Sequence, residues 1–272
     1  MTTGSAIQDL QVVSVWLCLL FASGCAIATG RPLLKPSSYG FSSLGVYTIA
    51  FLAALALRVA ISPATILHEN AHGYEYIRSS FSLHGFFWHG STYYAIFYPI
   101  SVLFGKHHSV VFGTNALLGA STAVLLGLFA SVVFRNRYAG FVTLILYSLW
   151  PSAIRISNSE SMFPVGVFFM AAALLSSVIA ITRKNAWSHL LFFCLLSCMI
   201  QTRPSLSIVG IALLVHHIAR YSLRQRDSFG LLIPGIVFFL VSITPWVAFR
   251  IADVTANGLP PSAAIRPRAA RA

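Results

Sequence analysis

Acidic residues are scarce in this chain, with six Asp and Glu among 272 residues against 18 Lys and Arg. Charged residues of both signs make up 9% of the sequence, whereas hydrophobic residues make up 57%. So low a charge content places the chain among polytopic membrane proteins. The net charge of +12 comes from basic residues scattered singly between apolar runs. It therefore indicates contacts with membrane lipids and gives no signal for nucleic acid as a partner.

Cysteine is equally scarce, and its four residues all lie inside apolar runs. A buried free cysteine behaves as a small apolar side chain. Cys194 and Cys198 share a helix face by their spacing, but no histidine or second cysteine pair completes a metal set. We therefore expect neither a disulfide nor a cysteine metal site. The first apolar run also lacks a basic n-region and a small-residue cleavage site, which predicts a retained helix and not a signal peptide.

Long apolar runs dominate what is present. Because only helices satisfy the backbone across runs of about 20 residues in lipid, the sequence predicts an all-α polytopic transmembrane helix bundle with a few shorter, marginal spans. We predict about eight spans, at 10–29, 44–61, 109–134, 139–154, 161–182, 187–202, 205–219 and 229–250. The aromatic-rich run 91–104 is too short to span, which predicts an interfacial helix whose tyrosines form a belt at the membrane surface.

Basic clusters set the expected orientation, because Lys and Arg in short loops favour the cytoplasmic side. Alternating the spans places four such clusters on one side, at 31–35, 135–137, 183–184 and 220–226. We expect an integral protein of a bacterial inner membrane whose functional end faces the periplasm. The expected organisation is an additional N-terminal helix with a cytoplasmic loop (1–43), a transmembrane core (44–250) containing the external loop 62–108, and a disordered tail (251–272).

Glu69 and Glu160 are the main candidates for chemistry, because both fall in external loops beside apolar runs. Carboxylates near hydrocarbon are rare unless they pair or act. Their functional interpretation is acid–base catalysis or coordination of a divalent cation in an external cavity. The alternative is a solvated loop residue, or an ion-pair partner of Arg58 or Arg155.

Two arginines at the same end suit a phosphate group. Arg58 lies three residues from the outer end of the span 44–61, and Arg203 lies in the turn QTRPSL. The planar guanidinium fork binds phosphate oxygens bidentately. The alternative for each is an arginine that only extends its charged end to the membrane surface.

The segment His68-Glu69-Asn70-Ala71-His72 matches the pattern H-E-x-x-H. On a helix this pattern places two imidazoles one turn apart for zinc, with the glutamate activating water. Gly73 follows directly and no third-ligand motif is evident downstream. A zinc-dependent intramembrane metalloprotease using His68 and His72 is therefore kept as an alternative.

The order of these motifs resembles the GT-C superfamily of membrane glycosyltransferases, and in particular the protein O-mannosyltransferases and aminoarabinose transferases of glycosyltransferase families 39 and 83. Each motif is weak alone, and the resemblance rests on their order over residues 44–219. The matching segments are LRVAI (57–61), HENAHGYEYI (68–77), WHGSTYYAIFYPISVLFG (88–105), TNALLGASTAVLLG (114–127), RNR (135–137), LWPSAIRISNSESMFP (149–164) and QTRPSL (201–206).

The resemblance implies transfer of a sugar from a polyprenyl-phosphate donor to an unidentified lipid, glycan or protein acceptor. It implies that Glu69 orients or deprotonates the acceptor hydroxyl and that Glu160 lies near the same cavity. Arg58, Arg203 and Arg155 are the candidates for the donor phosphate. The remaining candidate residues of the external loop are His68, His72, Tyr74, Arg78, His89 and Tyr93.

The chain departs from the family pattern at several points. His-Glu stands where the first loop usually has Asp, and Gly90 and Ser91 stand where two prolines are usual. Family members also run well past 272 residues. A truncated, inactive membrane protein or scaffold is therefore a further alternative. A small transporter is less favoured, because the polar residues gather on one side of the membrane.

Overall fold

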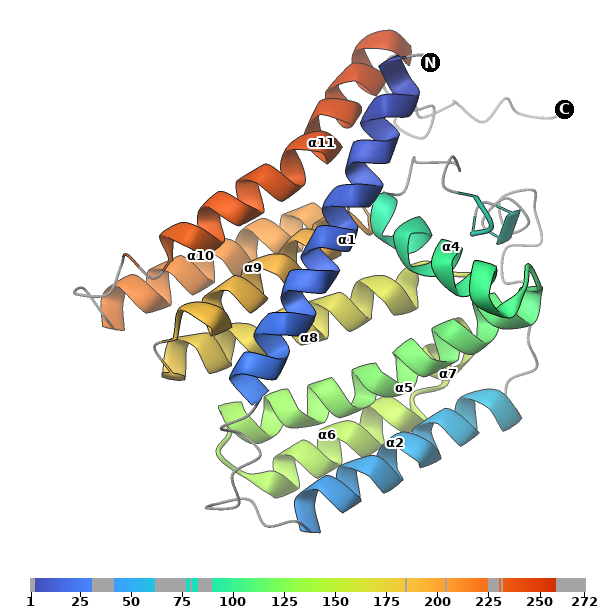
Figure 1. Ribbon diagram of the computed structural model, residues 1–272. Helices are drawn as coiled ribbons and strands as arrows, with labels where there is room; N and C mark the ends of the chain where they lie inside the picture. Colours follow the sequence, from blue (N-terminus) through green and yellow to red (C-terminus); the bar gives the residue numbers. More distant parts are fainter. Residues whose placement is uncertain are drawn as a thin grey trace, which may run out of the picture.

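The chain forms a bundle of helices (Figure 1). The computed structural model describes residues 3–30, 42–61, 77–78, 80–82, 90–183, 185–203, 205–224, 230 and 232–257. All regular structure within these ranges is helical, as the sequence predicts. The helices are α1 (Thr3–Gly30), α2 (Ser42–Ile61), α4 (Ser91–Phe104), α5 (His108–Val133), α6 (Arg137–Leu149), α7 (Pro151–Ser157), α8 (Phe163–Arg183), α9 (Ala186–Ile200), α10 (Leu206–Arg224) and α11 (Ile233–Asn257).

Among the residues that the structure describes, four helices are long and apolar enough to cross a membrane by themselves. They cover Ile7–Thr29, His108–Val133, Phe163–Thr182 and Ile233–Ala252, and the bent pair α6 and α7 makes a fifth if counted as one span. Three shorter apolar helices cover Gly45–Ala60, Ala186–Ile200 and Leu206–Tyr221. These lengths and compositions indicate a helical membrane protein.

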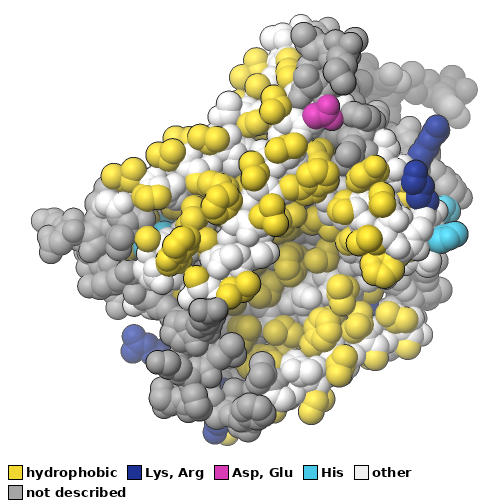
Figure 2. Space-filling view, in the orientation of Figure 1, with side chains coloured by type: hydrophobic (Ala, Val, Ile, Leu, Met, Phe, Trp, Pro, Cys, Tyr) yellow, Lys and Arg dark blue, Asp and Glu magenta, His cyan; other side chains and the backbone are white. Residues whose placement is uncertain are grey.

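The outer surface of the bundle is apolar, as a lipid-facing surface requires. Hydrophobic side chains cover much of the face in Figure 2, over α1 and α11 as well as the lower helices. Leu103, Ile208 and Leu20 are 77%, 76% and 70% exposed. Contiguous apolar exposure on this scale is unfavourable in water and indicates a hydrocarbon environment.

The N-terminal helix α1 packs within the bundle. In Figure 1, α1 crosses in front of α8 and α9 and runs beside α11. Its Trp16 Nε1 donates to Ala95 O of α4 at 2.8 Å, and its Gln11 Nε2 donates to Pro245 O of α11 at 3.3 Å. The described chain stays helical to Asn257, so α11 includes the first residues of the tail expected to be disordered.

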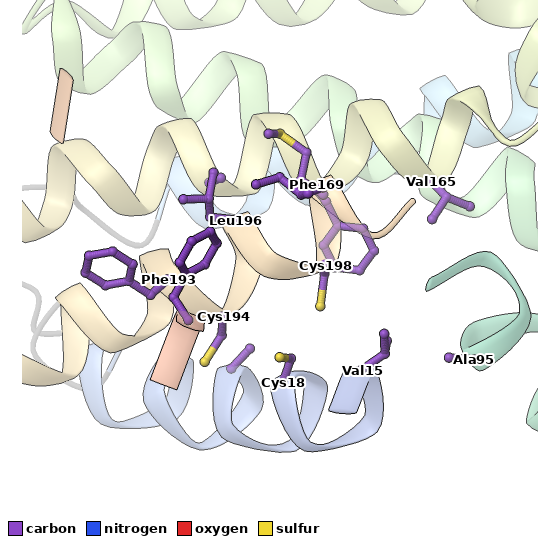
Figure 3. Close-up of a cluster of buried hydrophobic side chains, with 14 of the residues drawn as sticks. Val15, Cys18, Ala95, Val165, Phe169, Phe193, Cys194, Leu196 and Cys198 are labelled. Atoms are coloured by element: carbon purple, nitrogen blue, oxygen red, sulfur yellow. The ribbon is translucent and has the colours of Figure 1, made fainter. Parts of the chain in front are cut away.

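The interface of α1 with α9 contains all four cysteines, each fully buried as a free thiol. Figure 3 shows Cys18 of α1 opposite Cys194 and Cys198 of α9, among Val15, Phe169 and neighbouring apolar side chains. They fill the interface as small side chains, as the sequence predicts.

The predicted span 139–154 is not one straight helix, which corrects the sequence interpretation. It divides into α6 and α7, which meet at an angle of 62°. Pro151 occupies the first turn of α7, and Trp150 before it has the extended ψ of 115°. A proline disfavours the helical conformation of the residue before it but is well suited to begin a helix. The bend turns α7 toward α2, where the candidate site lies.

Helix α4 begins where predicted, but its tyrosines do not form a surface belt. Tyr93 and Tyr94 are fully buried, and Tyr93 stacks on Phe97 with ring centroids 4.3 Å apart. The belt expectation is wrong for these two because the Tyr93 hydroxyl finds partners inside the protein. Gly90 begins the helix at φ 115°, where a side chain would collide with the Gln201 carbonyl oxygen. Glycine therefore permits the close approach of α4 to the end of α9.

Candidate functional site

The break between α7 and α8 carries Glu160, and the surrounding helices hold it tightly. Glu160 has no exposed surface. Asn115 of α5 donates from Nδ2 to Ser159 O at 2.7 Å and to Ser161 O at 2.9 Å, the carbonyls on either side of Glu160. The Tyr93 hydroxyl donates to Glu160 O at 3.1 Å. Three successive carbonyls are thus hydrogen-bonded to side chains of α4 and α5, which satisfies backbone groups that a helix break leaves open.

Arg58 lies in the last turn of α2, and its side chain is fully buried between helices. Its Nη1 donates to Ala54 O at 2.9 Å, and its Nε donates to Ser157 Oγ of α7 at 3.3 Å. Its guanidinium carbon lies 5.7 Å from the centre of the Tyr147 ring. Nη2 has no hydrogen-bond partner among the described residues. The arginine therefore does not extend to the surface, and it keeps a donor for an anionic group.

Gly119 makes this arrangement possible. It lies on α5 where a β-carbon would collide with the Ser157 hydroxyl and would stand 2.9 Å from Arg58 Nε. It also lies one turn beyond Asn115, so that the two residues share a face of the helix. One face of α5 thus contacts both the buried arginine and the break that carries Glu160.

Arg203 follows the end of α9 at the same end of the bundle. Its guanidinium carbon lies 4.3 Å from the centre of the Phe163 ring, at the start of α8. Gln201 just before it is buried and anchors this turn. Its Oε1 accepts from Ser91 Oγ at 3.2 Å and from Ser14 Oγ at 3.4 Å, while its Nε2 donates to Ser197 Oγ at 2.9 Å. The fixed turn positions Arg203 three residues past the end of α9, on the α8 side.

The structure brings together some of the predicted site residues. Arg58, Tyr93 and Glu160 are buried and are linked through Ser157 and through the break at residues 158–162. Arg203 is partly buried, and Arg78 and Arg155 are exposed. The other candidates lie outside the described residues and have no structural account: His68, Glu69, His72, Tyr74 and His89.

Metal binding by the zinc-protease pattern therefore remains a prediction from sequence. Within the ranges that the structure describes, no group of three or more His, Cys, Asp or Glu side chains is arranged to hold a metal ion. The motif at residues 68–72 falls outside those ranges.

A buried polar chain at the opposite end of the bundle was missed by the sequence analysis. Ser177 Oγ of α8 lies 2.7 Å from His217 Nδ1 of α10, and His217 Nε2 lies 3.0 Å from His189 Nδ1 of α9. Phe192 stacks on the His217 ring at 4.0 Å. Histidine at an apolar helix position was the only signal in sequence, and it does not reveal a partner on another helix. The hydrogen bonds of Ser177, His217 and His189 join α8, α9 and α10 and stabilise their packing.

We expect His217→Phe to lower the free energy of unfolding by about 1–3 kcal/mol. Phenylalanine keeps the ring that stacks on Phe192, but it leaves the buried Ser177 and His189 without their partner. Thermal unfolding of the purified protein in detergent measures the change. His216→Phe is the matched control, because the adjacent His216 is exposed. Equal melting temperatures for the two variants would contradict this role for His217.

No protein-family model, curated protein or solved structure matches the chain.

Proposed function

We propose that the protein is a membrane glycosyltransferase that moves a sugar from a polyprenyl-phosphate donor to an acceptor. One observation carries the proposal. Arg58 is fully buried among apolar helices, yet its Nη2 has no partner among the described residues. A buried cation is costly unless an anion compensates it, and charged residues at membrane depth typically mark a substrate site.

A lipid-linked phosphate fits this position by its chemistry. Its hydrocarbon tail favours the bilayer, while its phosphate requires a cation and hydrogen-bond donors where the tail ends. Arg58 lies in the last turn of a helix whose outer residues are apolar, such as Val59 at 62% exposure. A donor that enters from the lipid would approach this turn of α2, and the buried guanidinium would have to become exposed for the phosphate to bind it.

The proposed reaction is a displacement at the sugar. The acceptor hydroxyl oxygen bonds to the sugar C1, and its proton passes to the Glu69 carboxylate. The bond between C1 and the phosphate oxygen breaks, and its electron pair leaves with polyprenyl phosphate. Arg58 and Arg203 stabilise the negative charge that develops on that phosphate. Glu160 orients the acceptor or the sugar, with or without a divalent cation.

The proposed setting is a bacterial inner membrane with this site toward the periplasm. Arg135, in the turn between α5 and α6, and Arg137, the first residue of α6, are exposed at the opposite end of the bundle. Basic residues in short turns favour the cytoplasmic side. A polyprenyl-phosphate sugar would then be consumed on the external face.

The test is release of polyprenyl phosphate from a panel of polyprenyl-phosphate sugars, with an acceptor fraction from native membranes. We expect release by the wild type and a loss of at least about 100-fold in Glu69→Gln, because glutamine cannot accept the proton. Equal release by both proteins would remove Glu69 from the mechanism. No release from any donor, together with stoichiometric bound zinc, would favour the peptidase alternative.

A further inference from the structure

We propose that Asn115 is a positioning residue that fixes Glu160 for the reaction. The inference rests on the proposed function for the role of Glu160, but the contacts of Asn115 stand independently of it. Asn115 is fully buried in the middle of the site, on α5, which contacts α2, α7 and α8.

Asn115 uses both hydrogens of its side-chain amide. A single side-chain nitrogen donates to Ser159 O and to Ser161 O, at 2.7 and 2.9 Å. These carbonyls flank Glu160, whose own carbonyl accepts from the Tyr93 hydroxyl at 3.1 Å. Rotating the amide would place its oxygen against two carbonyl oxygens, so the contacts determine its orientation. The backbone that carries Glu160 is thereby fixed on both sides.

The amide oxygen of Asn115 is unsatisfied within the described part of the chain. Asn115 Oδ1 is buried and has no hydrogen-bond partner among the described residues. An unpartnered buried acceptor is unfavourable for stability, and such groups are rare in folded proteins. An apolar side chain at this position would avoid the unpartnered oxygen, but it would leave the carbonyls of Ser159 and Ser161 without these donors.

The helix face that carries Asn115 also contacts the buried cation of Arg58. Gly119 lies one turn from Asn115 on the same face of α5, and it admits Arg58 Nε and the Ser157 hydroxyl. The same helix face therefore sets the positions of Arg58 and of the backbone at Glu160. A reaction that uses both groups depends on that spacing, because small misplacements of catalytic groups are costly to the rate.

The decisive variant is Asn115→Asp, which keeps the shape and removes both donors. We expect kcat for polyprenyl-phosphate release to fall at least about 30-fold, with KM for the donor changed by less than about threefold. Asn136→Asp is the matched control. Asn136 caps α6 at the opposite end by accepting from Tyr138 N at 2.8 Å, and aspartate accepts equally well. We expect this control to keep the wild-type kcat.

A second readout does not require turnover. In Glu160→Cys, the introduced thiol replaces a fully buried side chain. The four native cysteines are at most 1% exposed. A water-soluble maleimide should therefore react slowly with all five thiols. We expect the reaction at position 160 to accelerate at least about tenfold when Asn115→Asp or Asn115→Ala is added, because the break opens. The alanine variant serves if the aspartate variant does not fold.

The outcomes separate this inference from the proposed function. Faster labelling without any wild-type turnover would support the positioning role and reject glycosyl transfer. Unchanged labelling would overturn the positioning role, whatever the activity. Wild-type kcat in a folded Asn115→Asp protein would overturn it as well.

Discussion

Arg58→Gln is expected to lower kcat/KM for release of polyprenyl phosphate by about 100-fold to 1,000-fold. Glutamine can keep hydrogen bonds to Ala54 and Ser157, but it carries no charge to compensate the leaving phosphate. Arg58→Lys should retain part of the activity, since an ammonium group keeps the charge and loses the planar fork. The measurement is steady-state release from a labelled donor.

Arg137→Gln provides the control for Arg58. Arg137 is exposed at the opposite end of the bundle, with its guanidinium carbon 5.5 Å from the Tyr138 ring centre. Its loss should leave kcat/KM within about twofold of the wild type. If the two glutamine variants lose activity equally, the buried guanidinium is not the phosphate group's partner. Thermal unfolding in detergent identifies any variant that fails to fold.

Glu160→Gln is expected to lower kcat by about 100-fold or more, because the neutral amide cannot replace the charged carboxylate that orients the acceptor or the sugar. The amide replaces the carboxylate without a change in volume, and the backbone bonds from Asn115 and Tyr93 do not depend on the side chain. The break should therefore keep its conformation, which the maleimide reaction of a cysteine at the neighbouring Ser161 would report.

Asp9→Asn is the acidic control for Glu160. Asp9 is exposed on α1 and is not one of the proposed site residues. A Glu160→Gln variant with the activity of Asp9→Asn would show that Glu160 is structural, and the proposed site would then rest on Glu69 and the arginines alone.

Much of the helical architecture is predictable because apolar runs in lipid can only form helices. The prediction covers every described long helix, and α4 begins and ends as the aromatic run indicates. Pro151 explains the bend within 139–154, but a proline can either kink or end a span, so sequence alone does not decide between them. The central place of α1 depends on contacts such as Trp16 with Ala95, which no local pattern contains.

The site is predictable only in part, because residue types do not reveal partners. The sequence left Arg58 open between a phosphate ligand and an arginine that extends to the membrane surface. Its burial against Ser157 contradicts the second, and the phosphate role stays a prediction. Tyr93 was assigned to a belt because tyrosine is common at membrane surfaces. Its bond to the Glu160 carbonyl comes from a residue distant in the chain. The bonds from Asn115 to the carbonyls of Ser159 and Ser161 likewise join residues distant in the chain.

The most direct measurement is the binding of radiolabelled polyprenyl phosphate to the purified protein, because this product is common to every donor sugar and needs no acceptor. The account predicts saturable binding to the wild type and to Glu69→Gln, and a loss of at least about tenfold in affinity for Arg58→Gln. The unphosphorylated polyprenol should not compete. Equal binding of alcohol and phosphate, or equal affinity of the wild type and Arg58→Gln, would contradict a phosphate site at Arg58.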